Sequence, residues 1–312
     1  MKVTLIDSLH AAFVEALEKN GAFEINDRSE IPSDAVVSVL ADTEILVVRS
    51  KVRVTAALLD AAPKLKAIAR AGAGMDNIDE IVCRQRGIAL FNAPEGNRRA
   101  VAEHVLGMIL ALFNRMIPSH ISLVNEDQWN REAGRGEELL GKTVGLLGFG
   151  HNGSETGKLL SRLGCTVLAY DKYVSPDSFP EGVQPATLEE ISNRADVLSL
   201  HVPLTEETRG WVNYDFLRAF QHPFWLINAS RGEVLDWNAV PALMDSGKIR
   251  GVALDVFEKE PPFGHPIFEN LQKRPNVVFS PHVAGWTNES YQKISEILAT
   301  KLIHFQKNEV LD

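Results

Sequence analysis

The chain has 312 residues, of which 45% are hydrophobic and 23% are charged. That length allows one or two domains of ~100 to 200 residues, and the apolar content suffices for two cores. A formal net charge of −9 argues against a global field that attracts nucleic acid or an anionic membrane surface.

The cysteine usage and the amino-terminal residues both predict a protein of a reducing compartment, the cytoplasm. Cys83 and Cys165 form no CxxC motif, so neither a disulfide framework nor a structural metal site is expected. Residues 2–7 read as a strand rather than a signal peptide, and no apolar run approaches the ~18 residues of a membrane span. We expect a cytoplasmic protein with no metal, nucleic acid or membrane partner.

Short runs of β-branched and aliphatic residues alternate with helical stretches along the chain. This alternation predicts an α/β fold, with parallel sheets covered by helices on both faces. We expect two doubly wound domains with an active-site cleft between them: residues 1–98 with 288–312 as the substrate domain, and residues 99–287 as the cofactor domain. The expected strands fall into two sets: residues 3–6, 45–48, 67–69 and 88–91, then residues 143–147, 166–169, 197–200, 225–227, 252–254 and 277–279.

Two helical stretches connect or complete these sets. Residues 100–115 are almost all apolar, which predicts a helix buried between domains or between subunits. With residues 117–140 they are expected to form a two-fold dimer. Residues 289–307 predict a helix that packs back on the first domain. The apolar stripe of this helix comprises Ile294, Ile297, Leu298, Leu302 and Phe305. We expect no regulatory domain.

A glycine-rich turn follows the strand expected at residues 143–147. Gly148, Gly150 and Gly153 form GxGxxG between a strand and a helix, where Gly148 permits a tight turn, Gly150 lets the backbone approach a pyrophosphate, and Gly153 allows close helix–strand packing. The amides of His151 and Asn152 would face the phosphates at the helix amino terminus. Taken alone, the motif could equally be a glycine-rich turn without a ligand.

Asp171 strengthens the cofactor interpretation. It stands 18 residues after Gly153, at the end of the next expected strand, close to the ~20-residue offset of the acid that binds the ribose hydroxyls. A carboxylate there repels a 2′-phosphate, so NAD is favoured over NADP. Lys172 follows directly and weakens that preference without reversing it.

Polar residues also follow most of the other strands, at the edge where open parallel sheets bind ligands. Three segments, residues 228–236, 254–261 and 280–287, resemble the signature segments of D-isomer-specific 2-hydroxyacid dehydrogenases, in the same order and spacing. Residues 70–79 and 201–205 are similar to family segments too. Within the family, the phosphoglycerate dehydrogenase branch, in a short form without a regulatory domain, is the most similar.

The resemblance implies an NAD-dependent hydride transfer and gives each residue a role. His282 would exchange a proton with the substrate oxygen, Glu260 would hold His282 protonated, and Arg231 would grip the substrate carboxylate. From the other domain, Arg49, Ser50 and the amides of Gly72, Ala73 and Gly74 would hold the substrate. Further cofactor contacts are implied for Val202, Pro203, Thr208, Ala229, Ser230, Ala284 and, at the nicotinamide end, Asp255.

Each of these residues, taken singly, also fits an ordinary loop or solvated turn. The chain departs from the family pattern at His151 and Asn152, where a basic residue and isoleucine are common, and at Ala284 and Trp286, where many relatives have glycine and serine. A bulky Trp286 beside His282 could narrow the pocket.

The leading substrate is 3-phosphoglycerate, followed by hydroxypyruvate, glyoxylate or another 2-keto acid. A phosphate site would need converging cations, and the sequence alone does not show whether the candidates converge. The candidate cations are Arg49, Lys51, Arg53, Arg98, Arg99, Arg131 and Arg135.

Two alternatives come from other classes of protein. One is an NAD-responsive, corepressor-like protein-binding module, and the other is a degenerate relative with a purely structural role.

Overall fold

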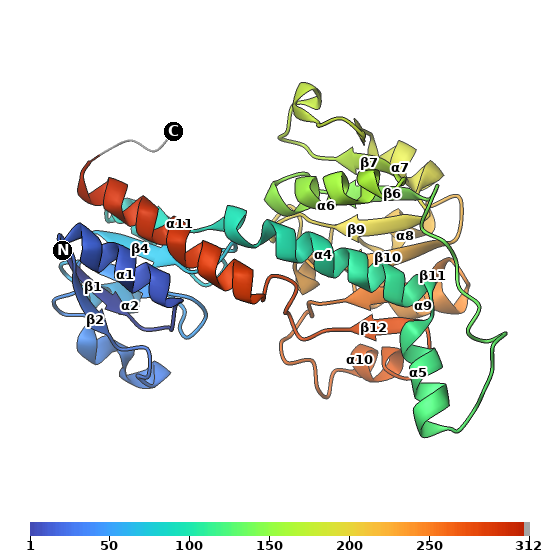
Figure 1. Cartoon of the computed structure of the whole chain (residues 1–312), viewed down its shortest axis with the longest axis horizontal. Coiled ribbons are helices and arrows are strands. Elements are labelled where there is room, and N and C mark those ends of the chain that lie inside the picture. Colours follow the sequence, from blue (N-terminus) through green and yellow to red (C-terminus); the bar gives the residue numbers. More distant parts are fainter. Residues whose placement is uncertain (309–312) are drawn as a thin grey trace. The chain divides into compact units, whose positions relative to one another are not determined.

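The structure is a computed structural model that describes residues 1–308 (Figure 1). The chain divides into two compact units. Unit 1 contains Met1–Asn97 and the chain from Trp286 onward, and unit 2 contains Arg98–Gly285. Both are α/β units with parallel sheets, which confirms the predicted fold class.

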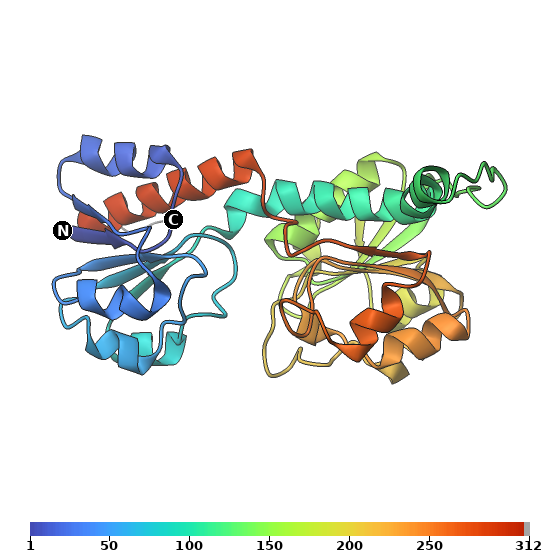
Figure 2. The ribbon, with the colours of Figure 1, turned by 90° about the horizontal axis from the view of Figure 1, so that it is seen from below.

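Unit 1 is built on five parallel strands in the order β2-β1-β3-β4-β5, the flavodoxin-like arrangement. Alternate residues of β3 face opposite sides, as the two-residue period of a strand requires. Ile45 and Val47 join the core under α1 and α11, and Leu46 and Val48 join the core under α2 and α3. Figure 2 shows these two pairs of helices on opposite faces of the sheet. The elements are β1 (Lys2–Leu5), α1 (Ala11–Asn20), β2 (Glu24–Asp27), η1 (Ser33–Val39), β3 (Ile45–Val48), α2 (Ala56–Asp60), β4 (Ala67–Arg70), α3 (Glu80–Gln85), β5 (Ala89–Phe91) and α11 (Asn288–Gln306).

Unit 2 holds seven parallel strands in the order β12-β11-β10-β9-β6-β7-β8. Counted from β6, this is the dinucleotide-binding order 3-2-1-4-5-6 with a further strand at the edge beyond the sixth. Helices α4 and α6 cover one face, and α7 to α10 cover the other. The elements are α4 (Pro94–Phe113), which enters from unit 1, then α5 (Met116–Asn125), β6 (Thr143–Leu147), α6 (His151–Arg162), β7 (Thr166–Tyr170), η2 (Pro176–Ser178), β8 (Val183–Pro185), α7 (Leu188–Arg194), β9 (Val197–Leu200), α8 (Tyr214–Arg218), β10 (Phe224–Asn228), η3 (Gly232–Val234), α9 (Ala239–Asp245), β11 (Ile249–Leu254), α10 (Pro266–Leu271) and β12 (Val277–Phe279).

Two strands were not predicted. Both β2 and β8 lie at an edge of their sheet, and most of their residues are partly or fully exposed. An edge strand pairs on one side and buries little, so its sequence lacks the apolar run that reveals a central strand.

The apolar helix expected between domains or subunits finds a different partner. Val105, Ile109 and Phe113 of α4 are buried in the core of unit 2, against Val144 of β6 and Trp225 of β10. Unit 2 itself therefore buries this face of α4. In contrast, α5 has no buried residue. Within residues 1–308 no helix alone meets the length and hydropathy of a membrane span; α4 and α5, bent by 59° where they join, do so only as a pair.

The carboxyl-terminal helix α11 packs as expected. Ile294, Leu298 and Leu302 are buried in the core of unit 1 with Phe13 and Leu17 of α1. Ile297 and Phe305 are partly buried at the margin of the same core.

Candidate functional site

The glycine turn after β6 is shaped by close backbone contacts. Gly148 has φ +97°, a left-handed value that favours glycine, and a Cβ there would lie 2.7 Å from the carbonyl carbon of His201. A Cβ on Gly153 would lie 2.1 Å from the Gly148 oxygen. These two positions admit no side chain, so the turn and the start of α6 can pack tightly.

Gly150 differs from both, because a Cβ there would meet nothing within 4 Å. It is the N-cap of α6, and no side chain caps this end of the helix. Helix amino termini carry unsatisfied N–H groups and a positive partial charge, which together bind anions. The open space at Gly150 and the uncapped amides of His151 and Asn152 therefore fit a pyrophosphate.

Asp171 lies just past β7, beside the glycine turn. Its Oδ2 accepts the N–H of Phe149 at 2.7 Å, and its Oδ1 accepts the N–H groups of Tyr173 and Val174 at 2.8 and 3.2 Å. Each carboxylate oxygen has two lone pairs, so Oδ2 can accept one more hydrogen bond. The backbone thus fixes a carboxylate that retains capacity for a ribose hydroxyl.

A cavity of about 200 Å³ joins several of the predicted cofactor residues. Gly148, Asp171, Val202, Pro203 and Thr208 all line it. The Thr208 hydroxyl donates to the Pro203 carbonyl at 2.6 Å and accepts the Thr205 N–H at 2.8 Å, which shapes the wall after β9. The apolar part of the lining, Leu188, Val202 and Trp211, suits a flat aromatic group such as adenine.

Arg231 is carried on a loop held by a buried asparagine at the end of β10. The Asn228 oxygen accepts both the N–H and the hydroxyl of Ser230, at 3.0 and 2.9 Å, and its amide donates to the Arg231 carbonyl at 3.0 Å. Gly232 follows, where a Cβ would lie 1.9 Å from the carbonyl carbon of Phe257. This close approach brings the Arg231 loop against the loop that leads to Glu260.

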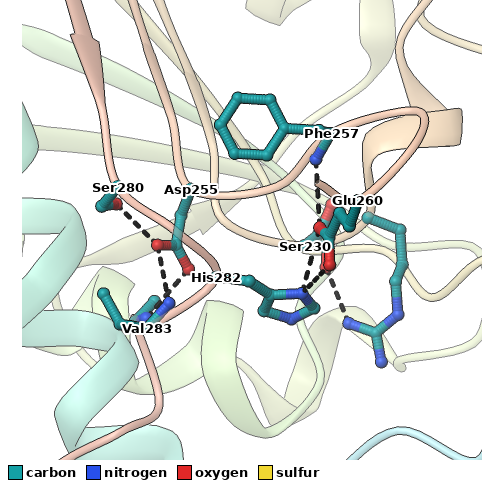
Figure 3. A network of polar contacts seen from close by, with 9 residues as sticks. Ser230, Asp255, Phe257, Glu260, Ser280, His282 and Val283 are labelled. Carbon is teal, nitrogen blue, oxygen red and sulfur yellow. Dashed lines mark hydrogen bonds and ion pairs between the residues drawn. The ribbon is translucent and has the colours of Figure 1, made fainter. Parts of the chain in front are cut away.

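Glu260 and His282 form a direct pair in unit 2 (Figure 3). The His282 Nδ1 lies 2.8 Å from Oε2 and 3.1 Å from Oε1 of Glu260, and because an ionised carboxylate only accepts, Nδ1 is the donor. The side chains are 47% and 40% exposed, so the pair faces solvent. Among the described residues, none hydrogen-bonds to the remaining nitrogen, Nε2. That nitrogen can exchange a proton with a ligand.

The environment of Glu260 favours its ionised form. Partial burial raises the pKa of this carboxyl, but the hydrogen bond and charge of His282, the Phe257 N–H and the charge of Arg231 outweigh it, and the pKa lies below its ordinary value. The Phe257 N–H donates to Oε1 at 3.2 Å.

Asp255 anchors the loop that carries His282. It is fully buried, and its carboxylate accepts the N–H groups of Val283 and Ala284, each at 2.9 Å, and the Ser280 hydroxyl at 2.6 Å (Figure 3). Its backbone oxygen accepts the His282 N–H at 2.7 Å, where His282 adopts φ +54°. The Asp255 carboxylate therefore fixes the backbone on which His282 stands, and its place at the nicotinamide end stays a prediction.

His104 was missed at the sequence level. From α4 its Nε2 lies 2.9 Å from the Ser280 hydroxyl and 3.6 Å from Asp255 Oδ1. The available signal was a single histidine, next to Glu103, in the middle of a mostly apolar helical run. Ser280 and Asn228 were missed as well, because both have supporting roles: the Ser280 hydroxyl contacts the side chains of Asp255 and His104, and Asn228 holds the backbone of Ser230 and Arg231.

In unit 1, Arg49 follows β3 and its backbone N–H donates to Asp7 at 2.7 Å. Its guanidinium carbon lies 3.3 Å from the ring centre of Trp286 and 5.8 Å from that of Tyr291, a cation–π arrangement. Burial lowers the pKa of Arg49, although an arginine remains charged. In the described chain, no carboxylate pairs with this guanidinium. Trp286 thus contacts a predicted substrate residue of its own unit.

The Gly72–Gly74 loop follows β4. A Cβ on Gly72 would lie 1.6 Å from the Arg70 guanidinium, so Arg70 folds closely over this residue. Asn92 donates to the Ala73 carbonyl at 2.7 Å, and Ala93 donates to the Gly72 carbonyl at 2.9 Å. No described residue accepts the N–H of Ala73 or Gly74. Ser50 is exposed.

Three of the candidate phosphate-binding cations already have partners. Arg99 pairs with Glu103 at 2.5 Å, Arg135 pairs with Glu132 at 2.8 Å, and Lys51 donates to the carbonyls of Ser29 and Ile31. Arg49 is the candidate whose guanidinium rests on aromatic rings instead of a carboxylate. Across residues 1–308, no group of three or more histidine, cysteine or acidic side chains is placed to hold a metal ion.

Comparison with known proteins agrees with this geometry. Residues 106–284 match the family model of the NAD binding domain of D-isomer specific 2-hydroxyacid dehydrogenases. The chain belongs to the D-isomer specific 2-hydroxyacid dehydrogenase family. Among members of the family, it is 34% identical to a hydroxypyruvate reductase of Thermotoga maritima, over 96% of this chain and 97% of that protein.

Two further relatives place the chain within the dehydrogenase family. It is 35% identical to the D-3-phosphoglycerate dehydrogenase of Archaeoglobus fulgidus over 98% of its residues, but spans only 58% of that protein. A crystal structure of a D-lactate dehydrogenase from Aquifex aeolicus, complexed with NAD and lactic acid, matches with a TM-score of 0.82 and 28% identity, over 99% of this chain and 96% of that one.

Proposed function

We propose that this protein is an NAD-dependent dehydrogenase that interconverts a D-2-hydroxy acid and its 2-keto acid. The His282–Glu260 pair, beside the charge of Arg231, is the observation that supports it most directly. In this proposal unit 2 is the NAD-binding domain and unit 1 is the substrate domain. The intact pair makes an enzyme a better assignment than a corepressor-like binding module or a degenerate relative.

In the proposed reaction NAD accepts the hydride during oxidation and NADH supplies it during reduction. Gly148, Gly150 and the amides of His151 and Asn152 would hold the pyrophosphate, and Asp171 would accept the ribose hydroxyls. Val202, Pro203 and Thr208 would form the adenosine wall. Gly153, Ala229, Ser230, Asp255 and Ala284 complete the proposed cofactor-binding set.

The acid–base step is assigned to His282. Its Nε2 would give a proton to the carbonyl oxygen during reduction and remove it from the hydroxyl during oxidation. Glu260 orients the ring through Nδ1 and stabilises the imidazolium. Arg231 would bind the substrate carboxylate through its planar donors, which also polarise the adjacent carbonyl.

The leading substrate is 3-phosphoglycerate with its oxidised partner 3-phosphohydroxypyruvate, as in the Archaeoglobus relative. In unit 1, Arg49 and the N–H groups of Ala73 and Gly74 are the proposed anion contacts, with Ser50 and Gly72 beside them. Hydroxypyruvate is the second candidate, because the Thermotoga reductase matches over 97% of its own length. Glyoxylate and other 2-keto acids stand behind these two.

The test is NADH oxidation by the purified protein with phosphohydroxypyruvate, hydroxypyruvate, glyoxylate and pyruvate. We expect turnover with at least one of them, and the highest kcat/KM with phosphohydroxypyruvate. A preference for hydroxypyruvate would keep the mechanism and replace the substrate. NADH binding without turnover of any 2-keto acid would contradict the dehydrogenase proposal.

We further propose that the protein is a cytoplasmic homodimer formed through α5 and the residues after it. Met116, Ile121, Leu123 and Val124 are 41 to 59% exposed, and Trp129 is 80% exposed. Large apolar side chains gathered on one exposed segment are typical of a subunit interface. A hollow of about 500 Å³ beside it, lined by Ile117, Ile121 and Arg274, would receive the partner's side chains.

A further inference from the structure

Lys172 occupies a sensitive position in the cofactor cavity. A lysine directly after the ribose-binding Asp171 could attract the 2′-phosphate that distinguishes NADP from NAD. Within the described chain, the lining of this cavity contains one cation, Lys172, and two carboxylates, Asp171 and Glu207. The cofactor preference therefore depends on what Lys172 contacts.

The structure shows that Lys172 is held by Glu207. The Lys172 Nζ lies 2.6 Å from Glu207 Oε1, and the Tyr173 hydroxyl donates to Glu207 Oε2 at 3.2 Å. Glu207 lies 35 residues further along the chain, in the loop after β9. Both carboxylate oxygens are thus engaged by the two residues that follow Asp171.

We propose that Glu207 is a second determinant of cofactor choice, which keeps the pocket selective for NAD by neutralising Lys172. A bound 2′-phosphate would add a charge of roughly −1.5 to −2 beside Asp171, and it would need a cation to offset that repulsion. While Lys172 is paired with Glu207, that cation is already neutralised. Glu207 is a positioning residue in this scheme, since it acts through Lys172.

The pair's own electrostatics agree with this role. The hydrogen bond and charge of Glu207 raise the pKa of Lys172, and those of Lys172 lower the pKa of Glu207. Lys172 is therefore charged at any pH at which the pocket would bind a nucleotide. The ammonium of Lys172 keeps its proton, and its pairing with Glu207 makes it less available to a phosphate.

The loop that carries Glu207 does not depend on this ion pair for its shape. The Thr205 and Thr208 hydroxyls lie 3.1 Å apart, and each accepts the N–H of the other residue, at 3.2 and 2.8 Å. Lys172 and Glu207 are 55 and 57% exposed, and exposed ion pairs add little to folding stability. Glu207 can therefore be changed to glutamine without unfolding the loop.

The inference rests on the NAD site of the proposed function, and its test reads binding rather than activity. We would titrate NADH and NADPH into the full-length protein and follow nucleotide fluorescence, for the wild type, Glu207→Gln, Lys172→Ala and the double variant. Glu206→Gln is the matched control, because Glu206 is an exposed neighbour of the same charge that does not line the cavity. Melting temperatures would verify that each variant is folded.

We expect Glu207→Gln to tighten NADPH binding about fivefold and to change NADH binding less than about twofold. Glu206→Gln should change neither, and in the Lys172→Ala background the effect of Glu207→Gln should largely disappear. An unchanged NADPH-to-NADH ratio in Glu207→Gln would overturn the inference, and so would an equal effect with and without Lys172. A wild type that bound neither nucleotide would contradict the NAD site of the proposed function. A wild type that bound NADH, with an unchanged ratio in Glu207→Gln, would contradict only the role of Glu207, so the two failures are distinguishable.

Discussion

The loop that carries His282 and the segment that contains α5 are opposite in character, although both belong to unit 2. In the first, the buried Asp255 accepts three hydrogen bonds, from Ser280, Val283 and Ala284, two of them from the backbone of the loop. In the second, apolar side chains such as Leu123 and Trp129 are 50 and 80% exposed. The hydrogen bonds of the first region lie within one chain, whereas the second presents exposed apolar side chains, which are the basis of the proposed dimer.

The largest expected effect tests whether the anchored loop serves chemistry. His282→Asn should reduce kcat by ~10² to 10⁴-fold, equivalent to ~3 to 5 kcal/mol of barrier, with NADH affinity unchanged, because it removes the group proposed to transfer the proton. Steady-state kinetics and NADH titration measure both quantities. The control is His265→Asn, since His265 forms a looser pair with Glu258 at 3.6 Å. An unchanged rate in His282→Asn would remove this residue from the mechanism.

Asp255→Asn tests the anchor itself. The new amide would present N–H groups to the backbone donors of Val283 or Ala284, and an unsatisfied buried group of this kind costs about 2 to 3 kcal/mol. Urea unfolding should show that loss. Asp245→Asn is the control, because it breaks only an exposed pair with Arg274, worth less than about 1 kcal/mol. Equal losses in the two variants would mean that the Asp255 network is not a structural anchor.

Ile121→Glu addresses the other region. A charge within an apolar interface should weaken the proposed dimer at least about tenfold, or ~1.4 kcal/mol, with little effect on the fold of the chain. Sedimentation velocity over a range of concentrations measures the change. Ile81→Glu provides the matched control, since Ile81 is 71% exposed in unit 1. A wild-type protein that sediments as a monomer would refute the dimer.

A last effect, confined to acidic pH, concerns a histidine beside the glycine turn. Burial lowers the pKa of His201 from 6.5 to about 4. The unfolded chain therefore takes up a proton below pH 6.5 that the folded protein refuses until about pH 4, and stability falls across that window. At pH 5 this loss amounts to at most about 2 kcal/mol.

His201→Gln should remove this part of the pH dependence. Chemical unfolding at pH 7 and pH 5 would show a smaller difference in the variant than in the wild type. The exposed His222, changed to glutamine, is the control. An identical pH dependence in His201→Gln and wild type would show that His201 is protonated normally in the folded protein.

Much of the fold was predictable because its signals are local. Central strands such as β6 and β9 bury both faces and read as continuous apolar runs, and the stripe on α11 repeats with the helical period. The edge strands β2 and β8 could not be predicted, because exposure weakens the apolar pattern of an edge strand. The surface that buries α4 could not be predicted either, because an apolar helix does not specify which surface covers it.

By itself, the sequence determined the strand–glycine–helix turn at Gly148, the acid at Asp171 and the order of the segments that hold Arg231, Glu260 and His282. These features depend on backbone conformations and spacings that neighbouring residues impose. Only the tertiary structure decided that Glu207 neutralises Lys172, that Trp286 stacks on Arg49, and that Asp255 and His104 support the His282 loop. Each of those contacts joins residues far apart in the chain. Folding brings such residues together, and no local pattern specifies which of many charged or aromatic side chains will meet.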